Sequence, residues 1–249
     1  AIDRAQELGA EAIQIFATSP RAWAFREPKD EHIADFLAKK NAAEVSPVFI
    51  HASYLVNIGG APDLVRKSID SLSKNMAVAG RIGAAGVIFH GGSHKGRGFE
   101  GVLGQASNAL REVLSASPNN VYLIIENSAG MGAHIGSSFP EVARLIQEVD
   151  SPQVKVCLDT QHSMAAGYDL GDPDGLELAL GEFDREIGLS KLVAVHANDS
   201  KVPVGDGVDR HENIGEGHLG LDGFETIMAH PAFREVTFIL EVPGPEKKG

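Results

Sequence analysis

Cysteine is almost absent from this 249-residue sequence, which has Cys157 alone. A single cysteine excludes an internal disulfide framework and suits a reducing compartment, and no secretory signal is visible, so we expect a cytoplasmic protein. Long apolar runs are also missing. The run at residues 121–125 ends at Glu126, far short of the ~18 residues that a membrane span needs.

Basic residues are scarce as well: 22 Lys and Arg stand against 34 Asp and Glu, for a net charge of −12. This balance argues against nucleic acid as a partner, because phosphate contacts normally come from Lys and Arg. The argument weakens if carboxylates bind metal ions. Three divalent cations would leave about −6 and would concentrate positive field in one cleft.

Short runs rich in Val, Ile and Leu alternate with longer helical patterns, and this alternation is typical of parallel β/α units. The predicted strands are 12–16, 48–51, 86–90, 121–126, 154–159, 192–196 and 236–241. The predicted helices are 33–43, 61–83, 103–116, 139–149, 175–187 and 222–230.

The chain opens on a helical pattern with no strand before it, and one further strand would make eight. We therefore predict a single domain over residues 1–249, an α/β fold of the (β/α)8 TIM-barrel class that lacks its first strand and last helix. A doubly wound open sheet is the alternative.

Six of the seven predicted strands end on a side chain that can bind a metal. These side chains are His51, His90, Glu126, Asp159, His196 and Glu241. Alternation along each strand places them on one face, so they can all point into the mouth of the barrel, where barrel active sites lie. Six such groups together would repel one another or shift their pKa values strongly, and bound cations resolve that conflict.

Two loops add further ligands. His162 lies three residues after Asp159, and Asp209 lies two residues before His211 in a glycine-rich loop. Imidazole together with carboxylate favours Zn, Fe or Mn over Mg or Ca, and five histidines with four carboxylates suit two or three ions. The complete set of predicted ligands is His51, His90, Glu126, Asp159, His162, His196, Asp209, His211 and Glu241.

Two other features have plainer interpretations. Residues 215–220 fit GxGxxG, but a polar loop rather than a strand precedes them, so the motif is weak evidence for a dinucleotide and we expect no organic cofactor. Cys157 shares a face with Asp159 but has no partner histidine in sequence, so we predict that it packs lower in the barrel.

At this point the residues resemble a known family, endonuclease IV, the metal-dependent apurinic/apyrimidinic (AP) endonucleases. The similar stretches follow one another in family order over almost the whole chain. They are residues 51–57, 89–94, 125–130, 157–170, 195–201, 209–220 and 239–241. The Cys-Leu-Asp and Asp-Arg-His sequences within them are the most specific.

The resemblance implies a zinc enzyme that cuts DNA on the 5′ side of an abasic site, with Glu126 as the catalytic, metal-bridging residue. It implies three ions, with Mn²⁺ or Fe²⁺ as possible substitutes, and a monomer. The implied ligand sets are His51, His90 and Glu126; Glu126, Asp159, His196 and Glu241; and His162, Asp209 and His211. The residues that enter damaged DNA would be Arg21, Tyr54 and Leu55. Ala52 stands where the family commonly has Asp, which would loosen support for His51.

Two other functions fit the sequence less well. A sugar isomerase or epimerase on the same barrel uses one or two ions and mainly carboxylate ligands, so the number of bound ions separates it from the endonuclease. A binding module without catalysis is the other possibility, and binding of damaged DNA without turnover would reveal it.

Overall fold

Seven parallel strands form one sheet, and they lie side by side in the order in which they occur in the chain. The structure is a computed structural model and describes residues 1–244. The strands are β1 (Ile13–Ile15), β2 (Val48–His51), β3 (Gly86–His90), β4 (Tyr122–Glu126), β5 (Val154–Asp159), β6 (Leu192–His196) and β9 (Thr237–Ile239). Sequential parallel order is the arrangement of a TIM barrel, whereas a doubly wound sheet reverses its order. The barrel prediction is confirmed and the open-sheet alternative is wrong.

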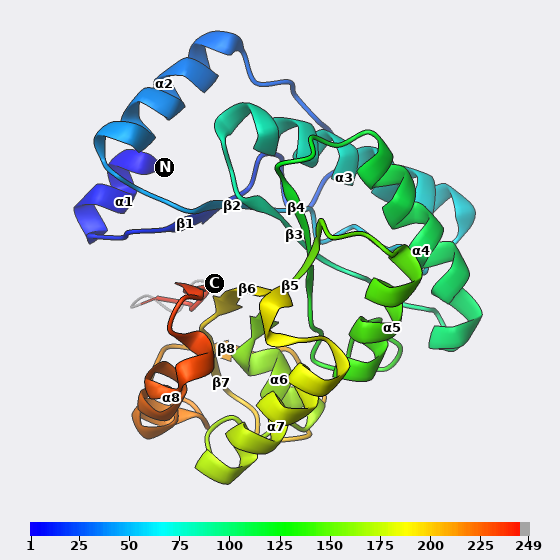
Figure 1. Cartoon of the computed structure of the whole chain (residues 1–249), viewed down its shortest axis with the longest axis vertical. Helices are drawn as coiled ribbons and strands as arrows, with labels where there is room; N and C mark the ends of the chain where they lie inside the picture. Colours follow the sequence, from blue (N-terminus) through cyan, green and yellow to red (C-terminus); the bar gives the residue numbers. More distant parts are fainter. Residues whose placement is uncertain (245–249) are drawn as a thin grey trace.

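Helices surround the sheet, which lies in the middle of Figure 1. They are α1 (Ile2–Leu8), α2 (Asp30–Ala42), α3 (Pro62–Ile82), α4 (Phe99–Ser115), α5 (Phe139–Val149), α6 (Thr160–Ala166), α7 (Pro173–Glu186) and α8 (Gly220–Ala229), with 3₁₀ turns η1 (Leu189–Lys191) and η2 (Pro231–Phe233). Their ends follow ordinary signals. The Asp172 side chain accepts a hydrogen bond from the Gly175 N–H at the start of α7, and Gly83 ends α3 with a left-handed φ of 63°.

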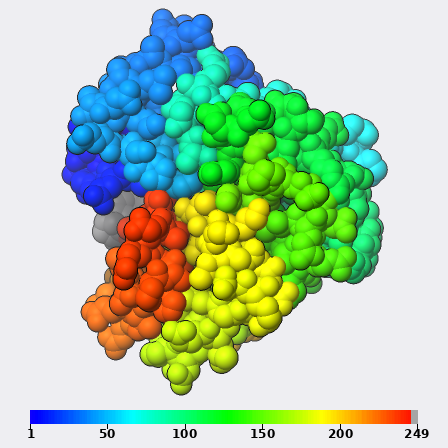
Figure 2. Space-filling view, viewed as in Figure 1, coloured from blue at the N-terminus to red at the C-terminus, as the bar shows by residue number. Residues whose placement is uncertain are grey.

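The two ends of the sheet, β1 and β9, do not pair with each other within the described part of the chain. Figure 2 shows the N-terminal segment, in blue, and the C-terminal segment, in red, on the same side of the molecule. The barrel is therefore nearly closed, and the facing edges belong to the first and last strands.

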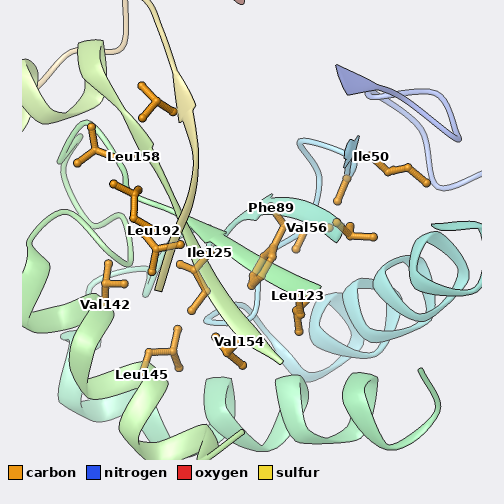
Figure 3. Packing of buried hydrophobic residues seen from close by; sticks show 14 of the residues in the cluster. Ile50, Val56, Phe89, Leu123, Ile125, Val142, Leu145, Val154, Leu158 and Leu192 are labelled. Carbon is orange, nitrogen blue, oxygen red and sulfur yellow. The ribbon is translucent and has the colours of Figure 1, made fainter. Parts of the chain in front are cut away.

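Two apolar layers lie on the two faces of the strands. The inner layer takes one residue from each of six strands: Phe49, Ile88, Ile124, Cys157, Ala194 and Ile239. The outer faces pack against the helices, and Leu123 and Ile125 of β4 belong to one buried cluster with Val142 and Leu145 of α5 (Figure 3). Cys157 is a buried packing residue, as predicted, and burial raises the pKa of its thiol to about 11.

Three short elements that were not predicted lie near the mouth of the barrel. The helix α6 follows β5 directly, because the Asp159 side chain caps it by accepting a hydrogen bond from the His162 N–H at 2.7 Å. Strands β7 (Asp199–Ser200) and β8 (His211–Glu212) pair antiparallel and fold the loop between them back over the mouth.

Candidate metal centre

The inner layer predicts where the strand-end side chains point. Ile124 lies in that layer, so Glu126, two residues further along β4, faces the same interior. The same spacing relates Ala194 to His196 and Ile239 to Glu241. Glu241 itself lies two residues beyond the end of β9, so the predicted strand 236–241 was too long.

Glu126 lies at the centre of the cluster and is fully buried. Its Oε2 atom lies 3.2 Å from Nε2 of His51 and 3.5 Å from Nε2 of His90. Its Oε1 atom lies 3.0 Å from Nδ1 of His196 and 3.3 Å from Nδ1 of His162. The two oxygens of one carboxylate thus face two separate pairs of histidines.

Three groups of side chains bring their ligand atoms within 4.8 Å of one another. They are His51, His90 and Glu126; Glu126, Asp159, His196 and Glu241; and Asp159, His162 and His211. The first two groups coincide with ligand sets that the resemblance implied. The third contains Asp159 where the resemblance implied Asp209.

Asp209 lies beside the third group. One carboxylate oxygen is 3.4 Å from Nε2 of His162 and the other is 3.3 Å from Nε2 of His211. The side chain is half exposed. Burial acts to raise the pKa of Asp209, but the hydrogen bond and charge of His162 lower it to about 2.

Backbone carbonyls orient three of the rings. Nδ1 lies 2.7 Å from the Ala52 carbonyl in His51, 3.0 Å from the Asn127 carbonyl in His162, and 3.4 Å from the Glu241 carbonyl in His211. A carbonyl only accepts, so Nδ1 carries the proton and Nε2 is left free as a ligand atom. At position 52 the support for the His51 ring comes from the backbone carbonyl of Ala52 and not from a side chain.

The pKa values of Glu126 and His90 are shifted in the direction that favours metal binding. Burial acts to raise the pKa of Glu126, yet the facing His196 and His90 hold it well below its usual range. Burial lowers the pKa of His90 to about 4. Ligand nitrogens without a proton and an ionised carboxylate are the protonation states that bind metal.

Unpartnered atoms give a direct test of whether these residues suit a cation. Among residues 1–244, five buried side-chain atoms have no hydrogen-bond partner, and three of them are Oε1 of Glu126, Nδ1 of His196 and Nε2 of His211. Buried polar atoms are rarely left without a partner unless an ion or water occupies the space between them. The imidazole and carboxylate donors therefore fit divalent ions of the Zn, Fe and Mn type.

Two asparagines that were not predicted support the carboxylates. Asn198 donates to Oδ2 of Asp159 at 2.6 Å and accepts from the Glu241 N–H at 3.0 Å. Asn127 accepts from the Asp159 N–H at 2.7 Å. Their positions one and two residues after the predicted ligands Glu126 and His196 were the available signal, because metal ligands are themselves usually held by hydrogen-bonding neighbours.

The GxGxxG stretch holds a carboxylate of the chain itself. Asp199 is fully buried, and its two oxygens accept hydrogen bonds of 2.9–3.2 Å from the N–H groups of Gly215, Gly217, Leu219 and Gly220. The glycine-rich loop is thus an anion-binding nest for Asp199, which confirms that the motif does not mark a dinucleotide site. Asp199 anchors the end of the loop that carries Asp209 and His211.

Replacing Gly217 by Ala should destabilise this loop. A Cβ there would lie 2.4 Å from Oδ1 of Asp199 and 2.5 Å from the Ser200 carbonyl, so the nest would have to open. We expect the free energy of unfolding to fall by ~1–3 kcal/mol. Denaturant unfolding measures it, with Gly104→Ala as the control, because a Cβ at Gly104 meets nothing within 4 Å. Equal stability of the two variants would contradict the nest.

A cavity of about 690 Å³ opens above the cluster. Arg21 and Tyr54, both predicted to contact DNA, line it, whereas Leu55 is half-buried beside Tyr54 and does not. Lining residues that were not predicted include Lys201, Arg210, Ser128 and His134. Lys201 and Arg210 lie within the family-like stretches, which was the available signal, and with Arg21 they give the rim of an acidic protein local positive charge.

The metal-free protein should lose stability as pH rises above neutrality. Burial acts to lower the pKa of His162, but Asp159, Asp209 and Glu126 hold it well above 6.5. Burial also acts to lower the pKa of His196, but Cys157, Glu126 and Glu241 hold it well above 6.5. A histidine with a raised pKa in the fold stabilises it below its unfolded pKa, and that stabilisation is lost as pH rises through the folded pKa.

We therefore expect the melting temperature of the chelator-treated protein to fall from about pH 7 to about pH 8.5. The zinc-loaded protein should show no such fall, because bound ions take the place of the protons. Thermal unfolding at both pH values, with and without zinc, measures this. A metal-free protein that gains stability over this pH range would contradict the raised pKa values of His162 and His196.

Comparisons with known proteins find relatives over almost the whole chain. Residues 2–249 match the family model described as xylose isomerase-like TIM barrel. The chain is 40% identical to a probable endonuclease 4 of Halothermothrix orenii, over 98% of this chain and 88% of that protein.

Solved structures give the same result. The crystal structure of endonuclease IV from Thermus thermophilus superposes with a TM-score of 0.87 at 38% identity, over 99% of this chain and 88% of that one. A D-tagatose 3-epimerase-like protein superposes with a TM-score of 0.76 at 16% identity, over 99% and 87% of the two chains, and shares the fold alone. The chain belongs to the endonuclease IV family, within the xylose isomerase-like TIM barrels.

Proposed function

We propose that this protein is a zinc-dependent AP endonuclease of base excision repair. It hydrolyses the DNA phosphodiester on the 5′ side of an abasic site and leaves a 3′-hydroxyl and a 5′-deoxyribose phosphate. The observation that carries the proposal is Glu126, a buried carboxylate with one oxygen facing Nε2 of His51 and of His90 and the other facing Nδ1 of His196, as a residue that bridges two ions requires.

Three ions would be held by nine side chains. His51, His90 and Glu126 would hold the first; Glu126, Asp159, His196 and Glu241 the second; and His162, Asp209 and His211 the third. The three groups of ligand atoms support this number of ions. Asp159 also lies 3.8 Å from both His162 and His211, so it stands between the second and third positions.

When bound, the ions lower the pKa of a water molecule and neutralise the charge of a phosphodiester. The fold of the chain fixes the positions of the metal ligands. Glu126 ends β4, which is paired on its two sides with β3 and β5, so the sheet fixes the spacing of the first two positions. Asp209 and His211 arrive on the segment that leads from β7 into β8, above the strand ends, and face the cavity that the substrate phosphate would enter.

Damaged DNA would bind at the rim of the cavity. Arg21, Lys201 and Arg210 offer positive charge to phosphates where the rest of the protein is acidic. Tyr54, 52% exposed, and its neighbour Leu55 would enter the duplex and kink it. Extrusion of an abasic nucleotide breaks no base pair, so this step favours the damaged site.

Replacing Tyr54 by Ala should weaken DNA binding without loss of metal. The Tyr54 ring packs 5.6 Å from the ring of Phe16 and 5.5 Å from that of His51, so it stands above the first metal position rather than within it. Stacking of an aromatic side chain on a base is worth ~1–3 kcal/mol, which corresponds to a rise in KM of about 5-fold or more. Steady-state kinetics with a parallel zinc analysis measures it; an unchanged KM would contradict the role.

A cleavage assay tests the proposed function. End-labelled duplex DNA with one abasic-site analogue should be nicked once, 5′ to the lesion, in the presence of zinc and not after chelation, while undamaged duplex should stay intact. Ketose sugars tested in parallel should be left unchanged. Turnover of a sugar, or tight binding of damaged DNA with no nick by metal-loaded protein, would overturn the proposal.

Location and assembly belong to the same proposal. Among residues 1–244, the helices are too short or too polar to cross a membrane. The one cysteine is buried and reduced, which supports a cytoplasmic location. A monomer is the assembly that the resemblance to endonuclease IV implies.

A further inference from the structure

Gln14 is a half-buried polar residue on β1, one edge of the sheet. It lies in the middle of β1 and pairs in register with Phe49, which belongs to the inner apolar layer, so its side chain points inward as well. The six other strands place an apolar side chain or Cys157 in that layer. A polar side chain at this depth needs partners.

Both partners of Gln14 are predicted metal ligands. Nε2 of Gln14 donates to Oε1 of Glu241 at 2.5 Å, and Oε1 of Gln14 lies 2.8 Å from Nε2 of His196. Because β1 and β9 are the two edges of the sheet, one amide ties the first strand to the segment after the last strand.

The chemistry of the three groups fixes where the protons lie. An ionised carboxylate offers only acceptors, so the NH₂ group of Gln14 must face Glu241. The carbonyl oxygen of Gln14 then faces His196 and can only accept, so Nε2 of His196 carries a proton. Nδ1 of His196 is thereby left as the ligand atom.

The free Nδ1 atom of His196 points toward the second metal position. It lies 3.0 Å from Oε1 of Glu126 and 3.2 Å from Oε2 of Glu241, and it is one of the buried atoms without a hydrogen-bond partner. Glu241 offers its other oxygen, Oε2, to the same point. Gln14 therefore turns one ligand atom from each of two side chains toward the second metal position.

His196 differs from its neighbours in this respect. His51, His162 and His211 are oriented through Nδ1 by backbone carbonyls and face the site with Nε2. His196 presents the opposite nitrogen, and its orientation depends on a side chain. A substitution can remove that support without changing a ligand.

We propose that Gln14 is a positioning residue that fixes the ring tautomer of His196 and the rotamer of Glu241 for the second ion. The inference rests on the proposed function only in that the site holds metal. It makes the affinity of one ion, among three, depend on a residue that touches none of them.

Two variants test this without altering a ligand. Gln14→Leu removes both the donor and the acceptor, and Gln14→Glu keeps the shape and an acceptor for His196 but sets a carboxylate against Glu241. Gln153→Leu is the matched control, since Gln153 also donates two part-buried hydrogen bonds, to the carbonyls of Pro118 and Val121 at the opposite end of the strands. Circular dichroism verifies the fold of each variant.

The readout is metal binding. Zinc affinities are obtained by competition with a chromophoric chelator, and native mass spectrometry counts the ions. Loss of a residue that orients a metal ligand typically costs 10–100-fold in metal affinity. We expect a loss of about that size for one ion in both Gln14 variants, with the other two ions and Gln153→Leu unchanged. In the zinc-loaded wild type, the Nε2 proton of His196 should give an NMR resonance that is protected from exchange. In Gln14→Leu this resonance should be absent.

Wild-type affinity for all ions in both Gln14 variants would overturn the inference, and so would an equal loss for all three ions, which signals a general loosening of the barrel. A wild-type protein that binds no zinc would instead contradict the proposed function. Three tightly bound ions in every variant would leave the proposed function intact and remove the role of Gln14.

Discussion

Replacing Glu126 by Gln is expected to lower the cleavage rate by more than about 100-fold while DNA affinity stays the same. Changes to residues that only orient a metal ligand already cost 10–100-fold, and Glu126 would itself bind two ions. The glutamine side chain of the variant has one oxygen, which can face only one of the two ion positions. It presents an NH₂ group to the other position, and an NH₂ group cannot bind a cation. Glu126 is fully buried and out of reach of DNA, so binding should survive.

Single-turnover cleavage and a DNA-binding titration separate these effects. Glu182→Gln is a suitable control, because Glu182 accepts a hydrogen bond from the Tyr168 hydroxyl away from the cluster and an amide oxygen can still accept it. If Glu126→Gln lost DNA affinity and activity in parallel, or kept its activity, Glu126 would not be the bridging, catalytic residue.

Removing the metal is expected to abolish cleavage and to lower the melting temperature by roughly 10 °C for each ion lost. A ligand present at 1,000 times its Kd stabilises a fold by ~4.1 kcal/mol per site, and 1 kcal/mol shifts the melting temperature of a domain of this size by about 2–4 °C. Without ions the mouth of the barrel also holds buried groups that lack partners, among them Oε1 of Glu126 and Nδ1 of His196.

Scanning calorimetry before and after dialysis against a chelator measures the effect, and elemental analysis verifies that the metal has gone. Zinc should restore both the transition and the activity. Demetallated protein that melts at the original temperature and still cuts DNA would show that the clustered side chains serve another purpose.

The strands could be predicted from sequence because apolar, β-branched runs ended on polar residues. The inward face also followed from spacing: Ile124 predicts Glu126, and Ala194 predicts His196. The helix α6 was missed because its residues Thr160 to Ser163 are polar although they are buried, so the sequence shows no apolar stripe there. Its Asp159 cap was visible in the sequence but was interpreted only as a ligand.

The set of clustered side chains could be predicted, but their orientation could not. Which nitrogen of His196 is free depends on Gln14, which is 182 residues away in the chain and reaches it only when the sheet curls. Gln14 sits between two isoleucines, an alternation that suggests a solvent-facing residue on a half-buried strand. In the folded barrel Ile13 and Ile15 pack on the helix-facing side, so Gln14 points inward beside Phe49.

We propose that the mouth of this barrel holds three ions on nine side chains. Anomalous diffraction from crystals grown with zinc is the decisive test, because the ions are located without reference to activity. We expect three peaks at the strand ends, one of them between His51 and His90, one beside His196, and one between His162 and His211. No peak in the mouth, or a single peak that leaves Glu126 without an ion on either side, would contradict it.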